Sequence, residues 1–308
     1  MLLSPSLGST SLLILGLSLT VLSGCKPEVF VYEDNPVPAY DEISTILVQN
    51  YVNRFYIDLI GREPNDEEME RDVAILEEGD LTMDIRLQVL DGLIEGMDSI
   101  DQFTYRGMVY QKLYTDLKAR FLEGASDGIL NARYGLLRGQ AINDSLNGNY
   151  IGYSIYQAAA ERMQLVLLSR VDLESGLIDV REVCHRMIWN SVYDMINMNS
   201  FNFIQACFDD LYQRFPTSAE FDAAYAIIEF NQPAEVFGMA AQDKPSFLDA
   251  MLLNPEWDEG MVRWVYRSFL ARDPGDGEVI EGMNAFANGL EVSTIQRLVL
   301  QSDEYAGF

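Results

Sequence analysis

Residues 52–64 read VNRFYIDLIGREP, and this stretch decides the fold because variants of it occur twice more along the chain. Residues 262–274 read VRWVYRSFLARDP, and residues 204–216 read IQACFDDLYQRFP. Apolar residues recur at three- and four-residue spacing in each copy, which is the pattern of an amphipathic helix. A recurring segment of this kind predicts a protein assembled from related helical units.

Each copy carries signals for the end of one helix and the start of the next. Pro64, Pro216 and Pro274 disfavour a helical conformation in the preceding residue, so we expect the first helix to end there. A cap position and a glutamate three residues later follow each proline: Asn65 and Glu68, Thr217 and Glu220, Gly275 and Glu278. The first two pairs are capping boxes. Gly275 has no side chain that could accept a hydrogen bond, so the third pair keeps only the hydrogen bond from the cap backbone to its glutamate.

The second helix of each copy is expected to end at Gly79, Asn231 or Gly289, which tolerate the left-handed backbone of a helix C-terminus. A third helix should begin near Thr82 and near Ser293, where Ser293 and Gln296 have capping-box spacing. Alternating strand-like segments are nearly absent. We therefore predict an all-α fold, a helical bundle built from capped helix-turn-helix units in three diverged copies.

The residues that recur in the copies could be mistaken for an active site. They are Arg62, Pro64, Glu68, Arg214, Pro216, Glu220, Arg272, Pro274 and Glu278. We interpret them as a structural motif, because the glutamates have a capping role and the prolines stop a helix. The arginines lie where the dipole of a helix C-terminus favours a cation.

The third copy resembles a domain of unknown function found in secreted and surface proteins of bacteria. Its pattern is Y-x-x-x-L-x-R-x-P, a glycine, and then V-L-x-S-x-E-Y. The matching residues are Tyr266, Leu270, Arg272, Pro274, Gly289, Val299, Leu300, Ser302, Glu304 and Tyr305. Residues 55–64 resemble the opening of a related domain that occurs beside cytochrome modules in planctomycete-type envelope proteins. The chain has no Cys-x-x-Cys-His, so the resemblance implies an all-helical envelope protein without a haem role or an assigned catalytic activity.

The N-terminus resembles the lipobox of bacterial lipoproteins. Leu22-Ser23-Gly24-Cys25 follows an apolar segment, Leu12–Leu22, which has the length of a signal-peptide core and is too short to span a bilayer. The resemblance implies that Cys25 becomes the first mature residue and carries acyl chains such as palmitate. Lys26 in place of Asp implies the outer membrane. The alternative is an ordinary secretory signal in which the cysteine stands by chance.

These features predict four segments. Residues 1–24 form a lipoprotein signal peptide, and residues 25–40 an extended, acidic and proline-rich tether. Residues 41–199 form a helical region with the first repeat, and residues 200–308 one with the second and third repeats. The two helical regions could pack as one domain.

The charge of the chain is strongly negative, with 48 acidic against 21 basic residues and a net charge of −27. Such a chain repels nucleic acid, so we expect no nucleic-acid partner. A solvated acidic surface explains the composition most simply. Binding of divalent cations is the alternative, although the acidic clusters lack EF-hand spacing.

Few residues can support catalysis or cross-linking. Cys184 and Cys207 could form a disulfide in an exported protein, or remain as buried free thiols. His185 is the single histidine and lies next to Cys184, and adjacent helical residues do not face each other. We therefore expect a structural histidine, no catalytic residue, no metal site and no cofactor other than the lipid on Cys25.

Three hypotheses for function follow. The first is a non-enzymatic, lipid-anchored protein of the outer membrane or cell surface that acts as a structural or protein-interaction module, docking to other envelope proteins or to itself. The second is a lipoprotein that captures glycans or divalent cations through aromatic or acidic grooves. The third is an enzyme that uses an unrecognised pair of carboxylates.

Overall fold

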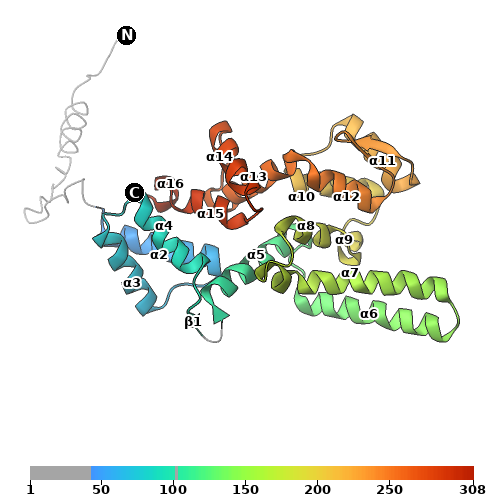
Figure 1. Ribbon diagram of the computed structural model, residues 1–308, viewed down its shortest axis with the longest axis horizontal. Helices are drawn as coiled ribbons and strands as arrows, with labels where there is room; N and C mark the ends of the chain where they lie inside the picture. The colour runs from blue at the N-terminus through green and yellow to red at the C-terminus, as the bar shows by residue number, and fades with distance from the viewer. Residues whose placement is uncertain (1–42, 101–102) are drawn as a thin grey trace, which may run out of the picture. The chain divides into compact units, whose positions relative to one another are not determined.

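Helices make up almost all the regular structure in residues 43–100 and 103–308, which the computed structural model describes (Figure 1). The predicted all-α fold is therefore confirmed. The predictions about the signal peptide, Cys25 and the tether concern residues outside this part of the chain.

The three predicted motifs each form a pair of helices joined by a short turn. The first helices of these pairs are α2 (Thr45–Ile60), α10 (Ser200–Tyr212) and α13 (Pro255–Leu270). The second helices are α3 (Asp66–Glu78), α11 (Ser218–Phe230) and α14 (Asp276–Ala287). A further helix follows each pair: α4 (Met83–Ile94), α12 (Lys244–Leu253) and α15 (Val292–Leu300).

The remaining helices connect the first motif to the second and close the chain. They are α5 (Tyr105–Phe121), α6 (Asp127–Leu146), α7 (Tyr150–Glu174), α8 (Val180–Ile188), α9 (Ser191–Ile196) and α16 (Asp303–Ala306).

Two short antiparallel hairpins interrupt the helices. The strands β1 (Ser99–Ile100) and β2 (Phe103–Thr104) pair before α5. The strands β3 (Ala234–Val236) and β4 (Met239–Ala241) pair between α11 and α12. The second motif thus reaches its third helix through a hairpin, where the other two motifs use a turn.

The chain reverses after the first helix of each motif through one left-handed residue. These residues occupy the same place in the three motifs, and they are Gly61 (φ 77°), Gln213 (φ 59°) and Ala271 (φ 54°). An L-residue with a Cβ pays an energetic penalty in this conformation, whereas glycine does not. Only the first motif therefore has a glycine at this left-handed position.

The predicted caps are largely confirmed. Asn65 and Glu68 form a capping box, as do Thr217 and Glu220, and Glu278 reaches back to the backbone nitrogen of Gly275 at 2.7 Å. The expected box at Ser293 is wrong, because α15 already begins at Val292 and no side chain caps it.

The helix α3 ends at Gly79 as predicted, but the left-handed conformation expected there is wrong. Gly79 has a φ of −96°, and the left-handed residues are the next two, Asp80 and Leu81. Gly79 is needed for space, because a Cβ there would lie 2.4 Å from the side chain of Ile85. Asn231 and Gly289 have the expected positive φ, at 49° and 121°.

The first and third motifs pack against each other, so that Ile43–Phe308 forms one compact unit. The Tyr51 hydroxyl donates to the carbonyl of Leu300 at 3.1 Å, and Tyr305 donates to Asp58 at 2.7 Å. Arg297 on α15 binds Asp91 on α4 at 2.7 Å. The predicted helical regions 41–199 and 200–308 thus share one hydrophobic core.

The helices α6 and α7 form a long antiparallel hairpin (Figure 1). Leu137 and Ala141 of α6 and Met163 of α7 are among the residues buried along its length. Its turn contains Gly148 with φ 73° and Asn149, whose side chain caps α7.

Candidate functional site

The recurring arginine and glutamate form the same ion pair in each motif. The arginine directly follows the left-handed residue, so the turn directs its guanidinium toward the glutamate in the first turn of the next helix. Two parallel hydrogen bonds join each pair, and the Nη2–Oε1 distance is 2.7 Å in all three: Arg62–Glu68, Arg214–Glu220 and Arg272–Glu278. We call these pairs the forks. Bidentate pairing of this kind is strong and geometrically specific.

Each fork also forms hydrogen bonds with the backbone of its turn. The arginine Nη1 donates to the carbonyl of the next residue, and the glutamate accepts from the cap nitrogen at 2.7 Å. Beneath each guanidinium lies an aromatic ring from the preceding helix, supplied by Tyr56, Phe208 or Tyr266. The predicted role of the arginines at the helix dipole is therefore incomplete, because their main contact is this ion pair.

The forks differ in what covers the glutamate. The three arginines are about equally exposed, but the exposed fraction of the glutamate side chain rises from 3% for Glu68 to 22% for Glu220 and 36% for Glu278. Tyr105 of α5 covers Glu68 and donates its hydroxyl to Oε1 at 2.7 Å. Arg214 and Arg272 each bind a second carboxylate instead, on Glu256 and Glu304.

All three fork glutamates have a lowered pKa. Burial alone would raise the pKa of Glu68, but hydrogen bonds from Arg62, Tyr105 and the Asn65 backbone outweigh it and bring the pKa to about 2. The hydrogen bonds from Arg214 and Arg272 likewise lower the pKa of Glu220 and of Glu278 to about 2. The fork glutamates therefore stay ionised and have no proton to donate near neutral pH. Each fork stabilises the turn of its own motif, and the three forks do not come together in one site. This supports the interpretation of the recurring arginines and glutamates as a structural motif.

Cys184 and Cys207 are free thiols that lie fully buried. Burial raises the pKa of both, that of Cys184 to about 12. A thiol that keeps its proton is a weak nucleophile and packs as a small apolar group. Of the two alternatives from the sequence, the structure has free thiols.

His185 lies on α8 and packs edge-on against Trp189, with ring centroids 5.3 Å apart. Its side chain makes no hydrogen bond or ion pair with the described residues. This environment fits the structural histidine that the sequence predicts.

Asp210 is a buried acid that sequence reasoning did not identify. The Tyr193 hydroxyl donates to its Oδ2 at 2.8 Å. Burial raises the pKa of Asp210 to about 7, although Tyr193 and Arg120 oppose this shift. Burial also raises the pKa of the Tyr193 hydroxyl and of the Cys207 thiol that it contacts, so both neighbours keep their protons and we interpret Asp210 as a pH-sensitive structural residue.

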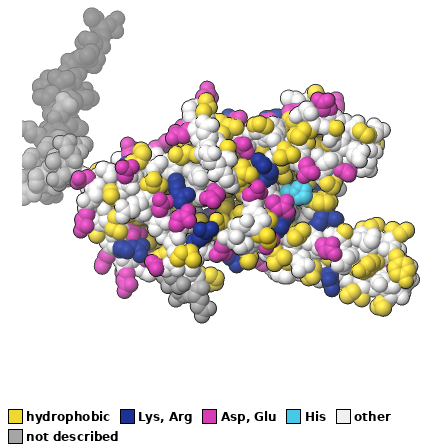
Figure 2. Space-filling model, in the orientation of Figure 1, with side chains coloured by type: hydrophobic (Ala, Val, Ile, Leu, Met, Phe, Trp, Pro, Cys, Tyr) yellow, Lys and Arg dark blue, Asp and Glu magenta, His cyan; other side chains and the backbone are white. Residues whose placement is uncertain are grey.

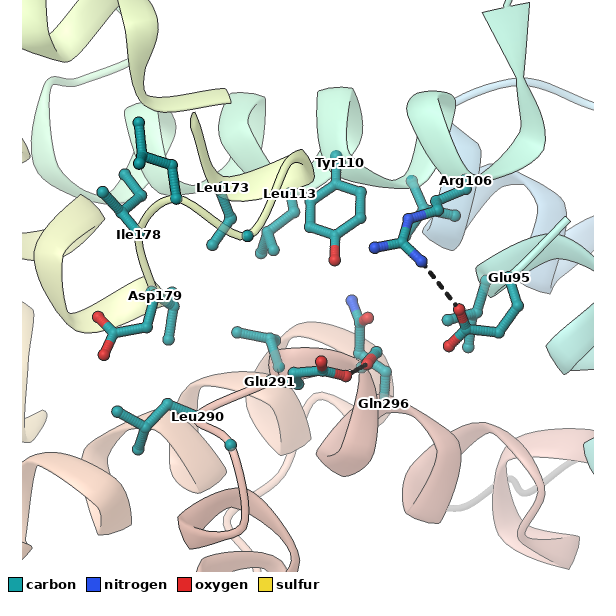
Figure 3. Close-up of a pocket in the computed structure, with 18 residues that line it drawn as sticks. Glu95, Arg106, Tyr110, Leu113, Leu173, Ile178, Asp179, Leu290, Glu291 and Gln296 are labelled. Atoms are coloured by element: carbon teal, nitrogen blue, oxygen red, sulfur yellow. Dashed lines mark hydrogen bonds and ion pairs between the residues drawn. The ribbon is translucent and has the colours of Figure 1, made fainter. Parts of the chain in front are cut away.

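A cavity with a volume of about 480 Å³ lies where α4, α5, the α7–α8 turn and α15 meet (Figure 3). This volume is in the range of small-ligand sites. One part of its wall is apolar and contains Leu113, Leu173, Ile178 and Leu290. Another part is polar and contains Glu95, Arg106, Tyr110, Glu291 and Gln296.

Sequence reasoning missed this cavity because its walls come from distant segments. The prediction that Gln296 takes part in a cap is wrong, because Gln296 lies on the buried face of α15 with Val292, Ile295 and Val299. The one signal in the sequence is that Gln296 occupies a position of the apolar face of its helix, which indicates a polar side chain directed toward the interior.

Two further searches cover only the part of the chain that the structure describes. There, no group of three or more His, Cys, Asp or Glu residues is placed to hold a metal ion. Nor does any helix among these residues combine the length and apolarity that crossing a bilayer requires.

Comparisons with protein-family models, with curated proteins and with solved structures give no match for this chain. The resemblance to surface and cytochrome-associated domains therefore stays a prediction that rests on the residues themselves.

Proposed function

We propose that this protein is a non-enzymatic, lipid-anchored module of the bacterial outer membrane or cell surface that docks to another envelope protein. The anchor rests on the lipobox at Leu22–Cys25. The docking role rests on a single observation, the exposed apolar end of the α6–α7 hairpin, which carries one charged residue.

The end of this hairpin exposes an unusual number of apolar side chains. We define the hairpin tip as residues 139–160. Its most exposed apolar residues are Leu146, Tyr150 and Ile151, at 83%, 73% and 77%, and Ile142 and Ile155 are also exposed. Figure 2 shows hydrophobic side chains gathered at this end of the hairpin with few charged ones among them. Contiguous exposed apolar surface of this kind typically marks an interaction site.

The tip also lacks the charge that characterises the rest of the chain. Asp144 is its only charged residue, whereas the whole chain carries a net charge of −27. The centres of protein interfaces are depleted in charged residues and enriched in tyrosine. Tyr150, Tyr153 and Tyr156 lie within the tip.

A different protein fits this tip better than lipid or a second copy. The asparagines and the serines of residues 143–154 would lose hydrogen bonds to water in the core of a bilayer, which makes deep insertion costly. Two copies repel each other through their like net charge. We therefore assign the tip to a protein partner that presents an apolar groove of low charge.

Site-directed photo-crosslinking in intact cells tests the docking role. A photoreactive residue at position 151 should give a discrete crosslinked product that contains a second protein. The same residue at position 280 is the matched control, because Ile280 on α14 is also exposed, at 63%. Equal products from the two positions, products that contain only lipid, or products that contain only this chain would each overturn the assignment.

A separate variant tests the anchor. Cys25→Ser should move the protein from the membrane fraction to the soluble fraction, because acyl chains hold a protein at about 0.8 kcal/mol per buried CH₂ group. Fractionation after a salt wash measures this. Retention of the variant in the membrane fraction would contradict lipid anchoring. The docking role would not be affected, because the crosslinking experiment at position 151 tests it separately.

A second candidate function is ligand capture, and the cavity between α4, α5 and α15 favours it. Its chemistry points to a small organic molecule rather than to a glycan or a divalent cation.

A further inference from the structure

The two halves of the chain match each other over a longer range than the three motifs. We define the first half as residues 45–196 and the second half as residues 200–306. The helices α2 and α5 of the first half correspond, 152 residues further on, to α10 and α13 of the second. Equivalent positions of α5 and α13 are either identical or buried in both helices: Tyr105–Trp257, Val109–Met261, Leu113–Val265, Tyr114–Tyr266, Leu117–Phe269, Ala119–Ala271 and Arg120–Arg272.

The ends of the two halves also match, at an offset of 112 residues. There α8 and α9 correspond to α15 and α16. The short helices α9 and α16 each follow a capping residue, Asn190 or Ser302, and each has a buried tyrosine three residues after this cap. The apolar residues at equivalent positions of α8 and α15 are buried in both helices: Val180–Val292, Val183–Ile295, Met187–Val299 and Ile188–Leu300.

The contacts between the halves are reciprocal. Tyr305 of the second half donates to Asp58 of the first at 2.7 Å, and Tyr193 of the first half donates to Asp210 of the second at 2.8 Å. These two tyrosines are equivalent, and so are the two aspartates. An interface in which equivalent residues exchange partners is the pattern of a twofold arrangement. The fold is therefore built from two equivalent halves that pack against each other.

The α6–α7 hairpin is the main departure from this symmetry. Because the offset falls from 152 to 112 residues, the first half has 40 additional residues between α5 and α8. In the second half this place is occupied by α14, which has 12 residues, whereas α6 and α7 have 20 and 25. The helix α5, the hairpin and α8 thus form a fourth motif in which the hairpin replaces the short second helix.

Arg120 bears a trace of this replacement. Its equivalent, Arg272, binds Glu278 and Glu304, but the first half has Ser126 and Val192 at the corresponding positions. Arg272 uses its Nε and Nη2 for Glu304, and the same two nitrogens of Arg120 are buried without a hydrogen-bond partner among the described residues. Replacement of a helix that carried the fork glutamate would leave an arginine in this state.

The outer part of the hairpin contributes little to the rest of the fold. The outermost hydrogen bonds from the hairpin to other helices are those of Arg133 with Ser191 at 3.0 Å and of the Leu165 carbonyl with Arg186 at 3.2 Å. Between residues 134 and 161, no side chain hydrogen-bonds or ion-pairs with a described residue outside the hairpin. Figure 1 shows this part extending beyond the other helices.

We propose that the outer part of the hairpin, residues 134–161, is an inserted partner-binding element that the fold does not require, and that each chain binds one partner through it. This inference rests on the docking role proposed above, and its occupant is the same protein partner with an apolar groove of low charge. Two equivalent halves would present any shared surface twice, whereas the hairpin occurs once. A single partner per chain therefore follows from the broken symmetry.

A chimera tests whether the fold needs the hairpin. Residues 121–179 are replaced by a second copy of residues 273–291, their equivalents in the other half. This restores a glutamate six residues after Arg120. We expect cooperative urea unfolding with a midpoint within about 0.5 M of that of the parent chain. The partner crosslinked at position 151 of the parent should no longer co-purify with the chimera.

A shortened hairpin decides the question if the chimera does not fold. Removal of residues 139–145 and 152–158 takes about two turns from each helix and keeps their faces in phase. Its urea midpoint should equal that of the parent. A midpoint lower by about 1 M or more in this variant, or continued co-purification of the partner with a folded chimera, would overturn the proposal.

A substitution and a mass measurement test the binding itself. Ile151→Asn should reduce co-purification of the crosslinked partner about tenfold or more, whereas Ile280→Asn on α14 is the matched control and should leave it unchanged. Native mass spectrometry of the complex should give one partner per chain, and two partners would overturn the stoichiometry. Absence of any crosslinked partner at position 151 in the parent would instead contradict the docking role, and the urea midpoints would still show whether the fold needs the hairpin.

Discussion

The first and third forks have the same residues and the same 2.7 Å ion pair, yet they lie in different surroundings. Glu68 is covered by α5 and is almost completely buried, whereas Glu278 lies at the surface. A buried ion pair that loses one partner leaves an uncompensated charge, while a surface pair is screened by water. The comparison teaches that a motif repeated in sequence need not contribute equally to stability, because the contribution depends on what packs over it.

Removal of the fork glutamates should give the largest difference between the two motifs. We expect Glu68→Ala to lower the free energy of unfolding by about 3 kcal/mol, because Arg62 and the Tyr105 hydroxyl lose their partner and the helix loses its cap. Glu278→Ala should cost about 1 kcal/mol. Urea unfolding followed by tryptophan fluorescence measures both, and equal losses would contradict the role of burial.

The pH dependence of stability should show two opposite effects. The fork glutamates have a pKa of about 2 in the folded protein against 4.5 when unperturbed, so their contribution is present above about pH 4.5 and is lost as the pH falls toward 2. Asp210 has a pKa of about 7 against 3.8, so its contribution is present below about pH 3.8 and is lost as the pH rises through 7.

Unfolding midpoints measured in urea across this pH range separate the two effects. Asp210→Asn should remove the loss of stability between about pH 4 and pH 7, and Glu278→Gln should reduce the loss at acid pH. A pH profile of Asp210→Asn identical to that of the unmodified protein would show that this carboxyl does not titrate as proposed.

A subtler substitution isolates the hydroxyl that covers the first fork. Tyr105→Phe should cost about 1 to 1.5 kcal/mol, because it removes a hydrogen bond to the buried Glu68 carboxylate and keeps the ring. Tyr110→Phe is a control on the same helix, since the Tyr110 hydroxyl lies beside the exposed Arg106 guanidinium and not against a buried carboxylate, and its effect on stability should be smaller. A loss in Tyr110→Phe as large as in Tyr105→Phe would contradict this explanation.

The left-handed residue of each turn offers the smallest test. We expect Ala271→Gly to stabilise the protein by about 0.5 kcal/mol, because relief of the left-handed penalty exceeds the added entropy of the unfolded chain. Gly61→Ala should destabilise it by about 1 kcal/mol, since φ is 77° there. Thermal unfolding of the two variants side by side gives the sign of each change, and a loss of stability in Ala271→Gly would refute the argument.

Sequence reasoning succeeded wherever a structural feature is local. The prolines, the capping pairs and the helical spacing of apolar residues predict the helix pairs of all three motifs, because each signal acts within about one or two helical turns. It failed for the backbone conformation of Gly79, where packing against Ile85 is what requires a glycine, and for the cap at Ser293, because α15 already begins at Val292.

The cavity and the burial of Glu68 could not be predicted in this way. Gln296 on α15 and Tyr110 on α5 are far apart in sequence, and they face each other only because α4 packs against both helices. Tyr105 covers Glu68 only because α5 crosses the first motif. Contacts of this kind leave no periodic signal in either segment.

The sequence by itself determined the helix pairs, their capped turns and the residues that recur in them, since each depends on residues that are neighbours along the chain. The tertiary structure alone decided which fork is buried, which hairpin end stays exposed and where a cavity remains. The physical reason is that helix formation and capping are local free energies, whereas burial and cavities depend on which helix faces meet, often across 200 residues or more, as for Arg297 and Glu95.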